Sequence, residues 1–296
     1  MMKRSKTACW IEAMRLRTLP VSLAGVIYAA GLGLLSWRFS LIPALLCLIF
    51  ALLAQIASNF ANEYYDFKGG LDKAGRQGPR RGVTEGDITP AAMKRATFAT
   101  LTAACTVGCV LVGLYGPWWM YLAGIATALG VMAYSTGPYP LSHHGFGEAA
   151  VVCFFGIVPV TLTFMLMGGP FGWWLLAAAA GIGLMGANVL IVNNYRDIDD
   201  DRAVGKRTLA VRLGLRSMSA IYLANGILAV ILTLPPWLAA GPVWWPVPAL
   251  YLCGHIFLYL RLTRLIGSRL NPLLGMTAVL MLVYALGFLL TVLAAA

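Results

Sequence analysis

The sequence predicts an all-α integral membrane protein with nine membrane-spanning helices. Of its 296 residues, 60% are hydrophobic and only 11% are charged, and the mean hydropathy is +0.79. A soluble domain carries about 25% charged residues. The apolar runs reach the length of about 20 residues that a membrane-spanning helix needs, and they lack the polar faces that surface helices of soluble proteins show.

The predicted spans contain Gly and Pro, which membrane helices tolerate. The first span follows a basic segment and is of full length, so we interpret it as a retained helix and not as a cleaved signal. The six cysteines form no CxxC pair, and we interpret them as small, buried apolar residues. We expect one polytopic membrane domain over 1–296, with spans near 18–36, 41–61, 96–115, 118–136, 147–168, 172–192, 217–239, 244–260 and 272–294.

The distribution of lysine and arginine predicts the orientation of the chain. Of the 22 basic residues, 21 lie before span 1 or in the connections that follow spans 2, 6 and 8, and Arg38 is the exception. Basic connections stay in the cytoplasm. We therefore expect a multi-pass protein of the cytoplasmic membrane with its N-terminus inside and its C-terminus outside. The net charge of +11 follows from this topology and from the anionic inner leaflet, without a nucleic-acid partner.

The acidic residues also fall on the predicted cytoplasmic side, although the rule for basic residues does not govern them. Eight of the eleven form two clusters, which are Glu63, Asp66, Asp72 and Asp87 after span 2 and Asp197, Asp199, Asp200 and Asp201 after span 6. Glu85 and Asp87 suit a solvated loop. Carboxylates at helical spacing at a membrane edge are instead a hypothesis for a functional site.

The two clusters share a spacing. The segments NEYYD at 62–66 and NNYRD at 193–197 each place Asp four residues after Asn, at the end of a span that runs towards the cytoplasm. Residues i and i+4 share one face of a helix. Asn62 and Asp66 are therefore expected on one face, and a second face carries Asn193, Asp197 and Asp201.

Converging carboxylates of this kind suit Mg²⁺, which takes one or two carboxylates and completes its shell with water and substrate phosphates. Nearby basic side chains can neutralise such phosphates; they are Lys68, Arg76, Arg80, Arg81, Lys206 and Arg207. The combination suits a lipid diphosphate. A transporter would carry ionisable residues near the bilayer midplane, whereas the middles of all nine spans lack Asp, Glu, Lys and Arg. We therefore favour an enzyme that works at the cytoplasmic interface.

Both motifs resemble those of the UbiA superfamily of intramembrane aromatic prenyltransferases, and most of all its 1,4-dihydroxy-2-naphthoate polyprenyltransferase (MenA) branch. The second motif, which continues into GKRTLAVRLG, is the specific part. The resemblance spans most of the chain, in the segments 14–26, 61–96, 134–156 and 192–214.

The resemblance implies nine helices around a central cavity, with Mg²⁺ and a prenyl diphosphate between motif 1 (62–72) and motif 2 (193–207). The implied metal-binding residues are Asn62, Asp66, Asp72, Asp197 and Asp201. The expected diphosphate-binding residues are Lys206, Arg207, Arg15, Arg80 and Lys68. Glu63 stands where the family usually has Asp, so we expect it to support the site and leave its direct metal contact open.

The resemblance further implies Mg²⁺-dependent transfer of a polyprenyl group to 1,4-dihydroxy-2-naphthoate with decarboxylation, in menaquinone biosynthesis. Asp66 and Asp197 would act through the metal on the leaving diphosphate. Tyr134 could stabilise the allylic cation through its ring face. Glu148 is expected to bind or deprotonate the acceptor, or to stabilise the start of span 5, and Asn193 is a further acceptor-binding candidate. We interpret His143 and His144 as loop residues and His255 as a packing residue.

Two alternatives stay open. One is a member of the same superfamily that uses another aromatic acceptor, such as 4-hydroxybenzoate. The more distant one is a lipid or ion transporter. The length of the prenyl chain, the oligomeric state and the full set of acceptor-binding residues leave no compact signature in the sequence.

Overall fold

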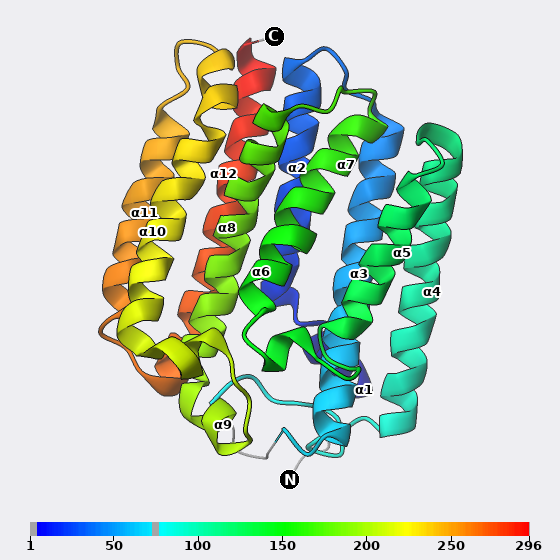
Figure 1. Cartoon of the computed structure of the whole chain (residues 1–296), viewed down its shortest axis with the longest axis vertical. Coiled ribbons are helices and arrows are strands. Elements are labelled where there is room, and N and C mark those ends of the chain that lie inside the picture. Colours follow the sequence, from blue (N-terminus) through cyan, green and yellow to red (C-terminus); the bar gives the residue numbers. More distant parts are fainter. Residues whose placement is uncertain (1–4, 73–76, 296) are drawn as a thin grey trace.

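The computed structural model describes residues 5–72 and 77–295, and all regular elements within these ranges are helical. The long helices stand side by side in a bundle, with the first helix at its lower end and the end of the last helix at its upper end (Figure 1). The first half contains α1 (Lys6–Met14), α2 (Leu19–Leu35), α3 (Leu41–Lys68), α4 (Pro90–Tyr115) and α5 (Met120–Ala133).

The fifth predicted span consists of three consecutive segments. These are α6 (Gly147–Val151), the π-helix η3 (Val152–Ile157) and α7 (Val158–Leu166). The remaining elements are α8 (Trp173–Arg196), α9 (Ile198–Ala203), α10 (Leu209–Ala239), α11 (Pro246–Leu262) and α12 (Asn271–Ala295). Short 3₁₀ turns lie at Leu16–Thr18, Leu141–His143 and Gly267–Leu270.

The predicted nine spans correspond in order to these helices. Over the described ranges, seven helical segments are long and apolar enough to cross a membrane, and Met120–Ala133 and Pro246–Leu262 are shorter apolar helices. Several helices start or end beyond the predicted bounds, and α3 and α10 do so by the most residues. α3 continues to Lys68, and α10 begins at Leu209 with a kink at Gly214, where φ is 77°. Hydropathy marks only the apolar part of such a helix, because helical hydrogen bonds continue into polar sequence.

The core of the bundle lies around α8, which contacts η3, α10 and α12. Small residues allow this close packing, as is usual between membrane helices. Gly156 on η3 faces Gly183 on α8 so closely that a Cβ atom at Gly156 would collide with the backbone there. Large aromatic side chains, including Trp237 and Tyr284, fill the space between α10, α11 and α12.

The connections that follow α3, α5 and α8 lie together at the lower end of the bundle, beside α1 and α9 (Figure 1). We call this the polar end. It carries both acidic motifs, whereas Arg38, in the connection from α2 to α3, lies at the opposite end. The helices thus bring two motifs more than 100 residues apart in the chain to one end of the bundle.

Candidate active site

The first motif begins on the last two turns of α3. Asn62 and Asp66 lie one turn apart, and the Asn62 amide nitrogen is 3.4 Å from Oδ2 of Asp66, as the four-residue spacing predicts. The helix ends at Lys68 with Gly69 as its C-cap, and Gly70 adopts a φ of +66°, a conformation that glycine takes without strain. This turn leads the chain back towards the bundle at Asp72.

Asp66 is the point at which three segments meet. The Lys206 ammonium donates to its Oδ2 at 3.1 Å, and Nε2 of His143 lies 3.4 Å from its Oδ1. Asp66 is only 2% exposed. The contact with Lys206 joins motif 1 directly to motif 2. His143, which the sequence analysis treated as a loop residue, belongs to this cluster, and only its place in a family-like segment could have indicated it.

Asn62 is held by two guanidinium groups. The Arg15 side chain donates to its Oδ1 at 2.6 Å and the Arg81 side chain at 3.3 Å, while the Asn62 amide donates to Ser135 at 3.2 Å. Arg15 occupies the left-handed region with φ of 53°, at the junction between α1 and the following 3₁₀ turn. The Arg15 side chain therefore lies within the candidate site.

Two further acids of motif 1 also contact the connection after α3. Oδ2 of Asp72 lies 3.3 Å from Nε of Arg81, and both side chains are buried. Oε1 of Glu63 accepts a hydrogen bond of 3.1 Å from the backbone N–H of Val83. Glu63 thus fixes the returning chain, which fits a supporting role.

The remaining basic candidates of motif 1 are Arg80, Lys68 and Arg76. Arg80 forms an ion pair of 2.6 Å with Asp87 in its own connection. Lys68 is exposed at the end of α3. Arg76 lies outside the described residues.

The second motif lies at the end of α8 and in α9. Arg196 donates hydrogen bonds of 2.7 Å to each carboxylate oxygen of Asp197, and its remaining donors reach Asn193 and Asn271 at 2.8 Å. The backbone N–H of Asp197 bonds the carbonyl of Asn193, and that of Asp201 bonds the carbonyl of Asp197. The four-residue spacing of motif 2 is therefore kept across the break between the two helices.

Lys206 and Arg207 follow a tight turn at Gly205, where φ is 77°. The backbone N–H of Lys206 donates to the carbonyl of Asp201 at 2.9 Å, and that of Arg207 donates to the carbonyl of His143 at 2.8 Å. These bonds dock the connection after α8 onto the connection after α5. The Arg207 side chain remains exposed.

Tyr134 follows the last residue of α5 and points its hydroxyl towards Gly147. Asn194, a residue that the sequence analysis did not single out, donates to Oε1 of Glu148 at 2.8 Å, and both side chains are buried.

The donor set fits a hard divalent cation in its chemistry. Asp66, Asp72 and Asp197 supply buried carboxylate oxygens at the polar end, the ligand type that Mg²⁺ prefers. Each is matched by a basic side chain in this structure, respectively Lys206, Arg81 and Arg196. Among the described residues, no group of three or more His, Cys, Asp and Glu side chains stands close enough to hold a metal. Metal binding would therefore require some of these ion pairs to exchange partners.

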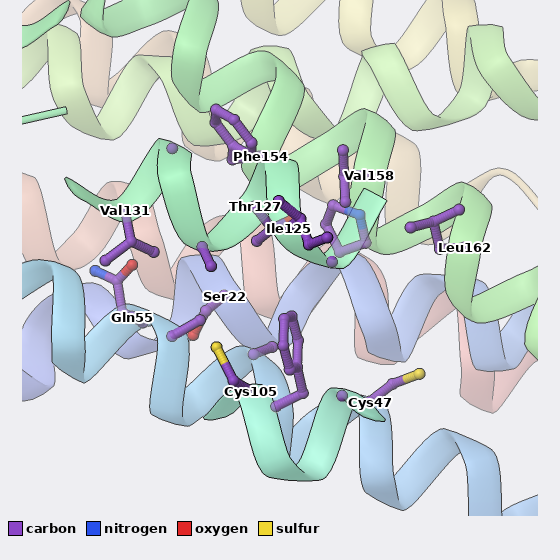
Figure 2. A pocket seen from close by; sticks show the side chains of 18 of the residues that line it. Ser22, Cys47, Gln55, Cys105, Ile125, Thr127, Val131, Phe154, Val158 and Leu162 are labelled. Atoms are coloured by element: carbon purple, nitrogen blue, oxygen red, sulfur yellow. The ribbon is translucent and has the colours of Figure 1, made fainter. Parts of the chain in front are cut away.

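An apolar cavity of about 490 Å³ lies behind this cluster. Its walls come from α2, α3, α4, α5, α6, η3 and α7, so it occupies one half of the bundle and not the exact centre. Figure 2 shows Phe154, Val158 and Leu162 on one side and Cys47 and Cys105 on the other. The cavity extends along the whole of α5, from Met120 to Tyr134 at the polar end.

One wall of the cavity borders the surroundings of the bundle. Ile125 and Leu129 line the cavity, yet they are 56% and 64% exposed. Cys109 also lines it and is exposed. Of the six cysteines expected to be buried, Cys9 and Cys47 are buried and Cys105 and Cys153 are half-buried, so the expectation was wrong for Cys109 and for Cys253. Both residues are on the outer part of apolar helices, where an exposed thiol would face lipid.

The bundle and its polar end define a class of helical membrane proteins. In this class, two acidic motifs and the basic residues beside them form a site at the mouth of an apolar cavity. The model of the UbiA prenyltransferase family matches residues 18–270, and the chain belongs to this family.

Two relatives carry the name 1,4-dihydroxy-2-naphthoate octaprenyltransferase. The protein of Escherichia coli K12 is 38% identical over 218 residues, which is 71% of this chain and 70% of the relative. That of Mycobacterium tuberculosis H37Rv is 37% identical over 286 residues and 94% of both chains.

Solved structures of the family share the fold. A UbiA homolog from Archaeoglobus fulgidus bound to DMAPP and Mg²⁺ has a TM-score of 0.68 at 15% identity, covering 95% of this chain and 99% of that chain. The apo structure of a UbiA homolog from Aeropyrum pernix K1 has a TM-score of 0.69 at 16% identity, covering 92% and 97%. The expected all-helical fold and family are thereby confirmed.

Proposed function

We propose that this chain transfers a polyprenyl group from a prenyl diphosphate to 1,4-dihydroxy-2-naphthoate, with loss of the acceptor's carboxylate, as an alkyl/aryl transferase of menaquinone biosynthesis. One observation carries the proposal: Asp66 and Lys206 join the two acidic motifs directly at the polar end of an apolar cavity. The names of the relatives supply the acceptor.

The polar end would hold the diphosphate. Mg²⁺, held by Asn62, Asp66, Asp72, Asp197 and Asp201, would supply positive charge for the departing diphosphate. Lys206 is close enough to the motif to exchange Asp66 for a phosphate oxygen, and Arg15 already lies in the cluster. Arg207 and Lys68 are exposed, and Arg80 would have to leave Asp87.

The apolar cavity would take the prenyl chain. Its length along α5 and its nearly apolar lining suit a hydrocarbon tail and exclude water from the reacting carbon. Tyr134 stands where the cavity meets the polar end. Its ring would stabilise positive charge on the allylic carbon.

The acceptor would enter beside Tyr134, where Glu148 and Asn193 are the candidates to contact it. We further infer that the whole chain acts as one polytopic domain in the cytoplasmic membrane. The concentration of basic residues at the polar end supports a cytoplasmic site, an inside N-terminus and an outside C-terminus. The partners are then the lipid bilayer, the prenyl diphosphate and the aromatic acceptor.

The test uses membranes that contain the protein, Mg²⁺ and a labelled prenyl diphosphate. Either 1,4-dihydroxy-2-naphthoate or 4-hydroxybenzoate is added, and prenylated product is measured. We expect product from the naphthoate, and loss of product with Asp66→Asn or Asp197→Asn. Prenylation of the benzoate alone would overturn the acceptor assignment. No product with either acceptor, in folded protein, would reopen the transporter hypothesis.

A further inference from the structure

Glu148 is a buried carboxylate in which one oxygen accepts a hydrogen bond and the other has no hydrogen-bond partner. It is 8% exposed, and its Oε1 accepts the hydrogen bond from Asn194 at 2.8 Å. Its Oε2 is buried without a hydrogen-bond partner. A buried polar atom left in this state destabilises the protein, so the arrangement indicates a ligand that completes it.

Glu148 does not itself line the cavity, but it lies beside residues that do. Glu148 and Val151 lie three residues apart on α6, on one helix face, and Val151 lines the cavity. The neighbouring Gly147 lies beside the Tyr134 hydroxyl, and Tyr134 also lines the cavity. Glu148 therefore stands at the level at which an acceptor ring would meet the end of a prenyl chain.

The other acceptor candidate already has a hydrogen-bond partner on its carbonyl oxygen. Oδ1 of Asn193 already accepts the Arg196 guanidinium at 2.8 Å. Asn194, the next residue, faces Glu148 instead and fixes the orientation of its carboxylate. The two adjacent asparagines thus serve the two sides of α8, one towards the acidic motif and the other towards Glu148.

We propose that Oε2 of Glu148 accepts a hydrogen bond from a ring hydroxyl of the aromatic acceptor, with Asn194 as the positioning residue. The inference rests on the proposed function and adds the chemical group by which the acceptor is recognised. A hydrogen bond from a hydroxyl to a carboxylate is charge-assisted and stronger than a neutral one. It also increases electron density in the ring, which favours attack on an allylic carbon.

Acceptor analogues test this contact directly. A site built to hydrogen-bond a substrate hydroxyl rejects an analogue that lacks it, because its own polar group is left unpaired. The experiment compares 1,4-dihydroxy-2-naphthoate with 1-hydroxy-2-naphthoate and 4-hydroxy-2-naphthoate. Binding to purified protein is followed by ligand fluorescence, with a non-hydrolysable prenyl diphosphate present.

For the wild type, we expect one of the monohydroxy analogues to bind about tenfold or more weakly than the dihydroxy compound. In Glu148→Gln, the difference between these two ligands should shrink to about twofold, while affinity for the prenyl diphosphate is unchanged. Asn194→Ala should also reduce the difference in affinity between the two ligands, but by less than Glu148→Gln does. Glu12→Gln, an exposed acid on α1, serves as the control and should discriminate as the wild type does.

The outcomes separate the two proposals. If the wild type binds none of the naphthoates, the proposed function fails. If it binds and discriminates but Glu148→Gln discriminates equally well, only the Glu148 contact is overturned. Thermal unfolding in detergent shows whether each variant is folded. Should Glu148→Gln unfold, Glu148→Asp keeps the charge with a shorter arm, and unchanged discrimination in that variant would also overturn the contact.

Discussion

Arg196 donates two hydrogen bonds of 2.7 Å to Asp197, its neighbour in the chain, and both side chains are buried. The guanidinium also donates to Asn193 on α8 and to Asn271 at the start of α12. This arrangement leaves the orientation of the Asp197 carboxylate little freedom. It also ties the second acidic motif to the last helix of the bundle.

Removal of Arg196 should therefore destabilise the protein. Breaking a buried ion pair leaves an uncompensated charge and costs about 3–5 kcal/mol. We expect Arg196→Gln to lower the unfolding temperature in detergent by several degrees. The matched control is Arg202→Gln, because Arg202 pairs with Asp199 at 3.3 Å on the exposed face of α9, where such pairs contribute about 0–1 kcal/mol. Equal effects of the two substitutions would contradict the prediction.

Lys206→Gln should weaken binding of the prenyl diphosphate more than binding of the acceptor. The variant loses a cation that lies 3.1 Å from Asp66, and a lost charge-assisted contact corresponds to about tenfold or more in KM. Steady-state kinetics with each substrate varied separately gives the two KM values. Lys94→Gln, an exposed lysine on α4, should leave both unchanged. A larger increase in KM for the acceptor than for the prenyl diphosphate would contradict a role of Lys206 in binding the diphosphate.

Occupancy of the cavity can be followed without turnover through its cysteines. Variants that keep only Cys109, which lines the cavity, or only Cys253, which is exposed on α11 away from it, are treated with a lipid-soluble maleimide. We expect a long prenyl diphosphate to slow labelling at Cys109 several-fold and to leave Cys253 unaffected. Equal labelling at Cys109 with and without the diphosphate would place the chain outside this cavity.

Two glycines of α5 provide a matched pair for the space inside the cavity. A Cβ atom at Gly130 would collide with the Phe154 ring, whereas one at Gly124 would meet no atom within 4 Å. Gly130→Ala should therefore displace Phe154 and raise KM for long prenyl diphosphates more than for short ones. Gly124→Ala should leave KM unchanged for both long and short prenyl diphosphates.

The double variant Gly130→Ala with Phe154→Ala removes the collision and should restore part of the binding. A similar loss in Gly124→Ala and Gly130→Ala would indicate a general effect on α5 and not a local one.

The sequence predicted the features that depend on local pattern. Apolar length identified the spans, and the four-residue spacing placed Asn62 and Asp66 on one face of α3. The sequence did not predict the contacts of His143, Asn194 and Asn271. Each is a single polar residue without a repeated spacing, and its partner lies 46 to 77 residues away in the chain. Such partners depend on how the helices pack.

Local sequence pattern also did not predict the boundaries of the cavity. Hydropathy treats all faces of an apolar helix alike, so it does not distinguish a face that borders a cavity from one that borders lipid. Ile125 on α5 does both. The π-helical part of the fifth span likewise leaves no mark in an apolar run.

The π-helix η3 suggests how the fifth span can change in length during evolution. A π-helical turn accommodates one more residue than an α-helical turn. Deletion of one residue within Val152–Ile157 would therefore convert this turn to α-helix and leave the orientation of α7 relative to α6 nearly unchanged. Val158 and Leu162 would keep their places in the cavity wall, and the acidic motifs on α3 and α8 would remain as they are.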